Sequence, residues 1–402
     1  MELVMFCHPS FLPSQSMPRF AKMLTAAYAA RGYRVQVWSP RPVLFNMVPR
    51  GRLSKWAGYV DQYLLFPIWV RRALVGVPQD TLFVFCDQAL GPWVPLVKNR
   101  PHVVHVHDML ALRSALGDVP ENPTSMTGRI YQRYIRRGFR RARHFICISG
   151  KTRDDLQRFG RTTPLTSEVV YNGLNFPYAP LSFDESQRVL LASGLMVPAT
   201  GMLLHIGGGQ WYKNLPGVIA LYAKYAAQVT DPVPLWCVTP GPNAVVRSML
   251  SKVPEKGHVR FLKGLESTTL QALYSRASVF LFPSLAEGFG WPLIEAQACG
   301  CPVITTDEPP MNEVAGEAAC YLPRLKSAAD LDSWSSRGAT VLRELLAESA
   351  SDRARRKELG QAWVKRFDAN KAIEGYLTIY KRISDITPAE RVKPGLNQST
   401  PV

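Results

Sequence analysis

Short apolar segments alternate with amphipathic helical segments along most of this chain, and no other feature of the sequence restricts the fold as strongly. The run LVMFC is followed by PRFAKMLTAAYAARG, whose apolar residues recur at helical spacing, and then by YRVQVWSP. Further apolar runs occur at 81–86, 102–107 and 144–149. Such runs are typical of strands that are buried on both faces of a parallel sheet. The pattern predicts a βαβ unit within a doubly wound α/β domain.

A second alternation of the same kind begins near residue 200. A stretch rich in proline and serine, 179–200, separates it from the first alternation and predicts a linker. Because 402 residues exceed one ordinary core, we expect two Rossmann-like domains that face a cleft. We place them at 1–185 and 200–369, with a helix near 370–386 that returns to the first domain and a loose tail at 387–402.

The net charge and the cysteine content indicate which binding partners and which cellular compartment to expect. The net charge is +17, and residues 1–186 carry 24 basic against 12 acidic side chains. This imbalance favours an anionic partner, with lipid headgroups and nucleic acid both open. Seven scattered cysteines without C-x-x-C spacing argue against a disulfide framework or a zinc site. No apolar run reaches the roughly 18 to 20 residues of a membrane span, and no signal peptide is recognisable, so we expect a cytoplasmic protein.

The segment EGFGWPLIEAQACGCP, residues 287–302, carries most of the candidate chemistry. It follows the apolar run VFLFPS with a glycine-rich turn, and Pro292 then fits the first turn of a helix. Free N–H groups at such a helix start can bind phosphate. Two carboxylates, Glu287 and Glu295, can instead accept hydrogen bonds from pairs of hydroxyls. A nucleotide sugar offers a ribose, two phosphates and a hexose in line, which matches this order.

The segment at 273–322 resembles the signature region of retaining GT-B glycosyltransferases of family four. Those proteins carry a glutamate, seven residues and a second glutamate, which corresponds here to Glu287 and Glu295. Segments elsewhere in the chain resemble other parts of the same family, namely ICISGKTRDDLQRFG, VVYNGLN, LLHIGGGQWYKN, VRFLKGL and GYLTIYKRI.

The resemblance implies that a nucleotide diphosphate sugar binds to the second domain. Glu295 would bind the ribose, Glu287 the sugar hydroxyls and Lys213 the diphosphate as a point charge. Relatives place an arginine after the first glycine of the LLHIGGG segment, where this chain has Gly208. No metal and no cofactor besides the donor are implied. The remaining donor-binding residues would be Gly207, Gly208, Leu265, Gly288, Phe289, Gly290 and Leu293.

Two histidines end the apolar run VVHVH in the first domain. The resemblance places His107 beside the donor sugar, and Asp108 would orient its imidazole or cap the next element. His105 has the same parity on the strand and is expected in the core. No general base is assigned, since in retaining enzymes of this type the departing phosphate is thought to take the acceptor's proton. Glu287 as a covalent nucleophile is the alternative.

The segment HPSFLPSQSMPRF follows the first strand where relatives carry a glycine-rich loop. Ser14 and Ser16 replace those glycines and are candidates for binding the acceptor or a phosphate, while an N-cap by Ser16 is the plain alternative.

Two basic aromatic stretches, 47–72 and 128–145, stand apart from these motifs. In the second, we expect Ile130, Tyr134 and Phe139 to face the sheet and the arginines to face outward. A solvated helix face is one interpretation, and docking to an anionic inner membrane leaflet is the other. The arginines are Arg129, Arg133, Arg136, Arg137, Arg140, Arg141 and Arg143.

We therefore expect a retaining hexosyltransferase that uses GDP-mannose or a UDP-hexose and extends a glycan or lipid-linked glycan of a bacterial surface polysaccharide, such as lipopolysaccharide. A nucleotide-sugar epimerase or another GT-B enzyme is one alternative, and a nucleic-acid-binding protein using the basic half is another. The G-x-G-x-x-G pattern of a dehydrogenase is absent from the glycine cluster at 207–209.

Overall fold

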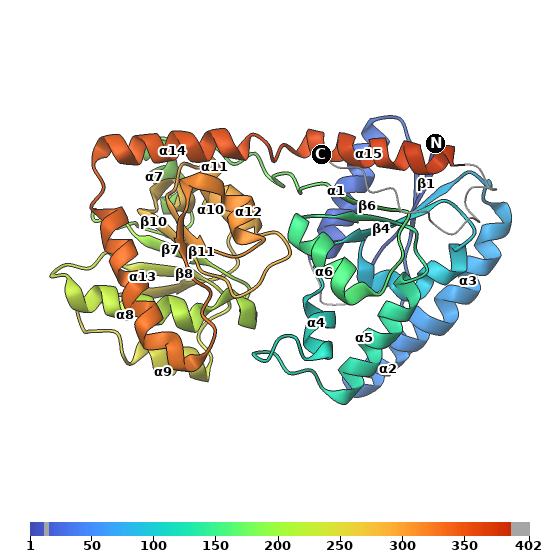
Figure 1. Cartoon of the computed structure of the whole chain (residues 1–402), viewed down its shortest axis with the longest axis horizontal. Helices are drawn as coiled ribbons and strands as arrows, with labels where there is room; N and C mark the ends of the chain where they lie inside the picture. The colour runs from blue at the N-terminus through green and yellow to red at the C-terminus, as the bar shows by residue number, and fades with distance from the viewer. Residues whose placement is uncertain (12–15, 387–402) are drawn as a thin grey trace. The chain divides into compact units, whose positions relative to one another are not determined.

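The computed structural model describes residues 1–11 and 16–386, which divide into two compact units (Figure 1). The first unit is Met1–Tyr171 together with the chain from Asn370 on, and the second is Asn172–Ala369. The expected linker at 179–200 instead contains helix α7 (Phe183–Ala192), which belongs to the second unit and packs against α10 (Ser267–Arg276). A capping box starts this helix, because Ser182 and Glu185 bond each other's backbone N–H groups at 3.3 and 2.9 Å.

The first unit is built on a parallel sheet with six strands among the described residues, in the order β2-β1-β3-β4-β5-β6. The strands are β1 (Glu2–Phe6), β2 (Arg34–Trp38), β3 (Leu82–Phe85), β4 (His102–Val106), β5 (His144–Cys147) and β6 (Thr166–Val169). The helices are α1 (Ser16–Ala30), α2 (Arg52–Val60), α3 (Phe66–Ala73), α4 (Leu110–Leu116), α5 (Met126–Phe139) and α6 (Gly150–Gly160). A π-helical turn, η2 (Asp61–Leu65), joins α2 to α3, and short helices η1 (Phe45–Met47), η3 (Leu74–Gly76) and η4 (Gln88–Val97) complete the unit.

Apolar residues cover both faces of this sheet, as the continuous runs predict. Helix α15 (Ala369–Asp385) returns to the first unit and packs with α1 on one face through Ile373, Tyr376 and Tyr380. Helices α3, α5 and η4 contribute to the core on the other face. The predicted arrangement of two doubly wound units with a returning C-terminal helix is confirmed.

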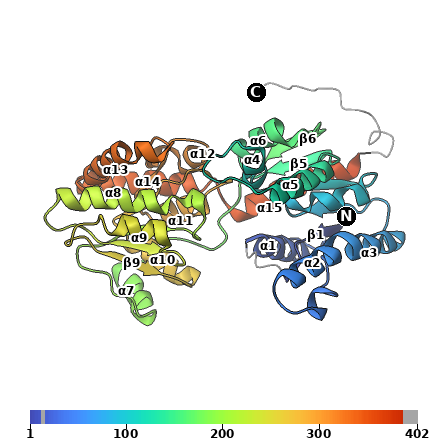
Figure 2. The same ribbon diagram turned by 90° about the horizontal axis from the view of Figure 1, so that it is seen from below.

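The second unit is built on another parallel sheet, with six described strands in the order β12-β11-β10-β7-β8-β9. The strands are β7 (Leu203–Ile206), β8 (Leu235–Val238), β9 (Val259–Leu262), β10 (Val279–Phe282), β11 (Val303–Thr306) and β12 (Cys320–Leu322). The remaining helices are α8 (Leu215–Gln228), α9 (Ala244–Leu250), α11 (Trp291–Ala298), α12 (Met311–Ala315), α13 (Leu331–Leu346) and α14 (Ala350–Val364), with short turns η5 (Trp211–Lys213), η6 (Gly316–Ala318) and η7 (Ala328–Asp330). Helices α8 and α13 lie side by side and share one core with the sheet (Figure 2).

Each sheet has one point at which the strand order reverses direction. In the second unit this point lies between β7 and β10, which pair in parallel through Leu203 with Val279 and Leu204 with Phe280. In the first unit it lies between β1 and β3, where Leu3 pairs with Leu82. Parallel sheets bind ligands beyond the carboxyl ends of their strands at such points. The loops after β7, β10, β1 and β3 are therefore the places to look for a site.

Helix α5 does not lie as the sequence predicted. Ile130 and Tyr134 are 57% and 44% exposed instead of facing the sheet, while Phe139 is buried as expected. The helix contacts η4 through two glycines, Gly91 and Gly138: a Cβ on Gly138 would lie 2.2 Å from the carbonyl oxygen of Gly91. The two glycines allow this close approach. Gly138 shares the buried face of α5 with Ile135 and Phe139, and Ile130 and Tyr134 lie outside that face.

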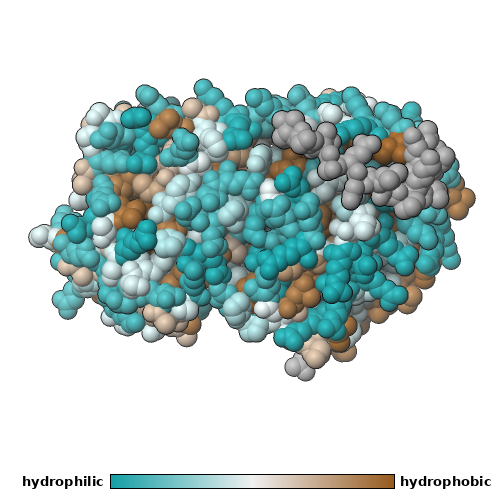
Figure 3. All heavy atoms as spheres, viewed as in Figure 1, coloured by the Kyte–Doolittle hydropathy of each residue, from teal (hydrophilic) through white to brown (hydrophobic). Residues whose placement is uncertain are grey.

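On the face drawn in Figure 3, hydrophilic side chains cover most of the surface and apolar side chains reach it in separate spots. Within the part of the chain that the structure describes, no helix is both long enough and apolar enough to cross a membrane.

The substitution Gly138→Ala tests the contact between α5 and η4. The added methyl group collides with the backbone of Gly91, so the free energy of unfolding should fall by about 2 to 3 kcal/mol. Gly76→Ala is the matched control, because a Cβ at Gly76 meets nothing within 4 Å. Urea denaturation of both variants measures the difference, and equal stability of the two would contradict the packing described.

Candidate functional site

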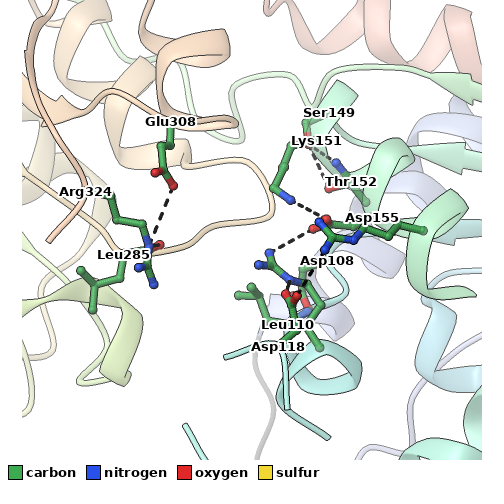
Figure 4. A network of polar contacts seen from close by, with 12 residues as sticks. Asp108, Leu110, Asp118, Ser149, Lys151, Thr152, Asp155, Leu285, Glu308 and Arg324 are labelled. Atoms are coloured by element: carbon green, nitrogen blue, oxygen red, sulfur yellow. Dashed lines mark hydrogen bonds and ion pairs between the residues drawn. The ribbon is translucent and has the colours of Figure 1, made fainter. Parts of the chain in front are cut away.

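The loop after β10 is fixed by hydrogen bonds from neighbouring segments. Side chains of three residues donate to its backbone carbonyl groups, and its own Leu285 N–H donates to the carbonyl oxygen of Tyr212, at 2.7 Å, in the turn after β7. Figure 4 shows the bond from Arg324 to Leu285. The side-chain bonds are Asn214 to Pro283 at 3.0 Å, Thr306 to Ser284 at 2.7 Å and Arg324 to Leu285 at 2.8 Å.

Lys213 and Glu287 meet where these two loops lie together. The Nζ of Lys213 is 2.7 Å from Oε1 of Glu287, and the Ser284 hydroxyl donates to the same oxygen at 2.8 Å. The two side chains are only 13% and 7% exposed, so each provides most of the other's charge compensation. Gly207 makes room for the lysine, since a Cβ there would lie 3.1 Å from the lysine side chain. The structure thus joins two residues for which the sequence predicted separate contacts with a ligand.

Glu295 is a buried carboxylate on the second turn of α11. It is 7% exposed, and its Oε2 accepts a hydrogen bond from the Tyr274 hydroxyl at 3.0 Å. Burial raises the pKa of Glu295 to about 7, against the lowering effects of the Tyr274 bond and the charge of Lys213. In the described residues Tyr274 is the one donor to this carboxylate, so Oε1 is available to a ligand hydroxyl. A carboxyl group with such a pKa is typical of a functional site.

The start of α11 has the backbone that the glycine-rich segment predicts. Gly290 takes a left-handed conformation at φ 101° before Trp291, and Pro292 occupies the first turn. Two of the expected donor contacts, Phe289 and Leu293, have buried side chains that pack in the core. These two residues can therefore offer a ligand only backbone groups.

The remaining donor-side candidates lie at strand ends of the same sheet. Gly207 is buried and Gly208 is exposed in the turn after β7, where Gly208 lies against the Gln210 side chain. Gly288 precedes Phe289 and is half-buried. Leu265 is half-buried in the turn after β9, which is separated from β7 by β8.

His107 lies at the carboxyl end of β4 in the first unit. Its Nε2 is 2.9 Å from the carbonyl oxygen of Cys86, which requires Nε2 to carry the proton and leaves Nδ1 as an acceptor. Within residues 1–11 and 16–386, buried Nδ1 finds no hydrogen-bond partner. Burial holds the pKa of His107 below its usual range, although Asp87 and the Cys86 carbonyl act in the other direction. His107 is therefore a neutral imidazole with a free acceptor.

Sequence reasoning missed two residues beside His107. His8 and Asp87 follow β1 and β3, and their Nε2 and Oδ2 atoms lie 2.7 Å apart. Burial would raise the pKa of Asp87, but the hydrogen bond to His8, electrostatic interactions with the His8 and His107 imidazoles and a bond from the Ala89 N–H lower it below the ordinary value. The sequence does carry a signal for these residues, because each comes directly after an apolar run. That the two residues meet follows only from the strand order, which makes β1 and β3 neighbours.

The other predicted residues of the first unit have structural positions. His105 is buried with its Nε2 2.6 Å from the Tyr380 hydroxyl, and burial lowers its pKa to about 3. Asp108 accepts a bond from the Leu110 N–H at 2.9 Å, at the first residue of α4, whose N-cap position is held by Met109. Ser16 is the first residue of α1, and Ser14 lies outside the described residues.

The segment ICISGKTRDDLQRFG forms the end of β5 and the whole of α6. Ser149 caps this helix by accepting a bond from the Thr152 N–H at 3.1 Å. Lys151 binds the carboxylate of Asp155 (Figure 4), and Arg113 binds the same carboxylate at 3.2 Å. These contacts connect α4 to α6. Among the described residues, no group of three or more His, Cys, Asp and Glu side chains is placed to hold a metal ion.

Comparisons with known proteins match both units. Residues 17–176 match the model described as Glycosyltransferase Family 4, and residues 198–329 match Glycosyl transferases group 1. The chain is 31% identical over 355 residues to the MMP alpha-(1->4)-mannosyltransferase of Mycolicibacterium hassiacum, covering 78% of this chain and 82% of that protein. It is 25% identical over 246 residues to the O-antigen chain mannosyltransferase RfbU of Salmonella typhimurium, covering 60% and 61%.

A solved sucrose-phosphate synthase from Thermosynechococcus elongatus has the same fold, with a TM-score of 0.67 and 17% identity over 95% of this chain and 98% of that one. The fold and the matches define a glycosyltransferase of GT-B architecture. The chain belongs to glycosyltransferase family 4. It matches 46% to 61% of the lengths of RfbU and two further curated relatives.

The pH dependence of stability tests the burial of Glu295. The ordinary pKa of a glutamate is 4.5 and the pKa of Glu295 in the folded protein is about 7, so between these values the folded state holds a proton that the unfolded chain has lost. The free energy of unfolding should therefore fall as the pH rises through this window, by about 3 kcal/mol.

The variant Glu295→Gln keeps an acceptor for Tyr274 but has no proton to lose. Denaturant titrations at pH 5 and pH 8 should show the variant gaining stability relative to the wild type as the pH rises. A constant difference at the two pH values would show that Glu295 titrates normally.

Proposed function

We propose that this chain transfers a hexose, with retention of the anomeric configuration, from a nucleotide diphosphate sugar to a glycan or lipid-linked glycan. The observation that carries the proposal is the placement of Lys213, Glu287 and Glu295 around the β7 and β10 strand ends and α11. Cations and free N–H groups suit a diphosphate, while partly buried carboxylates suit hydroxyl groups.

Binding of the donor would replace the Lys213–Glu287 contact of the free protein with contacts to the donor's own groups. The diphosphate binds the N–H groups at the start of α11 and draws Lys213 away from Glu287. Glu287 then accepts hydrogen bonds from the hexose hydroxyls, and Oε1 of Glu295 accepts them from the ribose. Because Lys213 and Glu287 neutralise each other in the free protein, binding separates the pair only when a ligand supplies both a negative group and hydroxyl donors.

Catalysis on this proposal is positioning and stabilisation of the departing diphosphate. The acceptor hydroxyl attacks from the face that the nucleotide leaves, and the departing phosphate oxygen takes its proton. Lys213 compensates the charge that develops on that phosphate. Glu287 is a poor covalent nucleophile on this proposal, since its carboxylate accepts bonds from the Ser284 hydroxyl and from the hexose hydroxyls. The role of His107 beside the donor sugar stays a prediction, since its Nδ1 is a buried acceptor within the first unit.

The names of two relatives support a choice of donor and acceptor classes. Both are described as mannosyltransferases, one of them acting on an O-antigen chain, so GDP-mannose is the first candidate donor and UDP-hexoses come next. The acceptor would be a surface polysaccharide precursor bound by the first unit.

We also propose that the first unit docks to the anionic inner face of the cell membrane. Arg133, Arg137, Arg140 and Arg141 are exposed on and just after α5. Each basic side chain near an anionic surface contributes roughly 1 kcal/mol. A membrane-bound enzyme of this kind would meet a lipid-linked acceptor without diffusing through the cytoplasm.

Nucleotide release from a panel of donors tests the transferase activity. Wild-type protein should release nucleotide from one donor in the presence of a glycan acceptor, and Lys213→Met should lower that rate by about a hundredfold or more, as the loss of a group that stabilises developing charge does. Lys224→Met is the matched control, because Lys224 pairs with Asp332 at the surface of the second unit.

An equal rate for the two lysine variants would contradict the role of Lys213. Conversion of a donor to another sugar nucleotide without any acceptor would identify an epimerase instead. DNA binding that exceeds donor binding and weakens steeply with salt would favour the nucleic-acid alternative.

Charge reversal tests the membrane proposal. Arg133→Glu/Arg137→Glu should weaken cosedimentation with phosphatidylglycerol vesicles by about tenfold or more, because two attractions become repulsions. Arg337→Glu/Arg355→Glu makes the same change in net charge at exposed positions of the second unit. Equal sedimentation of both variants would refute docking through α5.

A further inference from the structure

A large aromatic pocket lies in the first unit between two helical segments that the proposed reaction leaves unused. One wall is α2 with the π-helical turn η2, and the other is α5. The pocket encloses about 950 Å³, within the range of pockets that bind small organic ligands. Its lining residues are Lys55, Trp56, Tyr59, Tyr63, Ser125, Thr127, Gly128, Ile130, Tyr131 and Tyr134.

The inner wall of the pocket is apolar although it contains tyrosines. The hydroxyls of Tyr63 and Tyr131 bond each other at 2.6 Å, so these two polar groups satisfy one another. The Tyr59 and Tyr134 rings pack edgewise or tilted against this pair, with centroids 5.9 Å from Tyr131 and 5.5 Å from Tyr63 respectively. A ligand in this pocket would meet ring surfaces more than hydrogen-bonding groups.

The outer rim carries exposed apolar side chains. Trp56 is 67% exposed, Ile130 57% and Tyr134 44%, and each of them lines the pocket. Large apolar side chains that gather at an open cavity mark a binding surface. Ile130 and Tyr134, which the sequence analysis placed against the sheet, therefore belong to this apolar rim.

The charge around the pocket is positive. Lys55 lines it, and on α5 Arg129 and Arg133 each directly precede a lining residue and lie on the adjoining stripe of the helix. Between Arg41 and Gln79 the one acidic residue is Asp61, and none occurs from 122 to 153. Asp61 is buried and accepts the N–H groups of Leu44 and Phe45, both at 2.9 Å. Its charge is thus compensated within the protein.

We propose that this pocket binds the hydrocarbon chain of a single-chain lipid phosphate whose phosphate lies at the basic rim. An apolar cavity with a cationic rim and no uncompensated acid complements an amphiphile of this kind. The inference rests on the proposed function, because such a lipid would be the carrier of the glycan acceptor. A neutral glycan suits the pocket less, since it needs hydrogen-bonding partners on the walls and no cationic rim.

Farnesyl phosphate, below its aggregation concentration, is the probe, and calorimetry measures its affinity. Ile130→Glu places an anion at the apolar rim and should weaken binding by about tenfold. Met126→Glu makes the same change in charge on the same helix, 66% exposed and outside the lining, and should leave the affinity within about twofold. Inorganic phosphate should bind neither variant nor the wild type. Circular dichroism checks that both variants fold.

Three results would overturn the pocket proposal. These are no binding of farnesyl phosphate to the wild type, equal losses in the two variants, or binding of inorganic phosphate as tight as that of farnesyl phosphate. The failure of the proposed function looks different: a chain that binds farnesyl phosphate in the pocket but releases nucleotide from no donor would retain the pocket and lose the transferase assignment.

Discussion

The parallel pairing of β7 with β10 is the constraint on which the candidate site depends. These strands are far apart in the sequence, and their hydrogen bonds place the turn after β7 beside the loop after β10. One turn supplies the lysine and the other supplies the glutamate, and neither loop could position the pair by itself. The loop after β10 is then held from further directions by Asn214, Thr306 and Arg324. A rigid scaffold thereby presents ionisable groups in a fixed geometry.

The buried ionisable side chains of this site lower the stability of the folded protein. Lys213 and Glu287 are largely buried and compensate each other, so removal of either leaves an uncompensated charge. Glu295 has a tyrosine hydroxyl as its partner, and its raised pKa means that ionisation at neutral pH opposes folding. A well-packed apolar residue would stabilise the fold more at that position. The retention of a carboxylate is understandable if it accepts hydroxyl groups from a ligand.

The sequence predicted the fold class well because its signal is local. Apolar runs, helical spacing and glycine turns each lie within a few residues, and the two sheets and the returning helix follow from them. The helix α7 was missed although its capping box is a local signal, because prolines on both sides suggested a linker. The pairing of His8 with Asp87, the salt bridge of Lys213 with Glu287 and the burial of Phe289 and Leu293 depend on strand order and packing. Such contacts join distant segments, and no local pattern specifies them.

The orientation of α5 is a further property that local sequence patterns do not specify, and it bears on function. Helical spacing alone allowed Ile130 and Tyr134 to face the sheet, but the buried face of α5 is formed by Ile135, Gly138 and Phe139. Ile130 and Tyr134 line the aromatic pocket opposite Trp56. A packing detail within the core of the first unit thus determines which side chains reach its surface.

The central claim is that the β7–β10 strand ends and α11 bind an activated sugar, and a crystal structure of the protein with GDP-mannose or the donor selected by the panel tests it most directly. The account predicts hexose hydroxyls within hydrogen-bond distance of Glu287, the ribose at Glu295, and Lys213 moved onto the diphosphate. A donor bound elsewhere, with Lys213 still paired to Glu287, would contradict it.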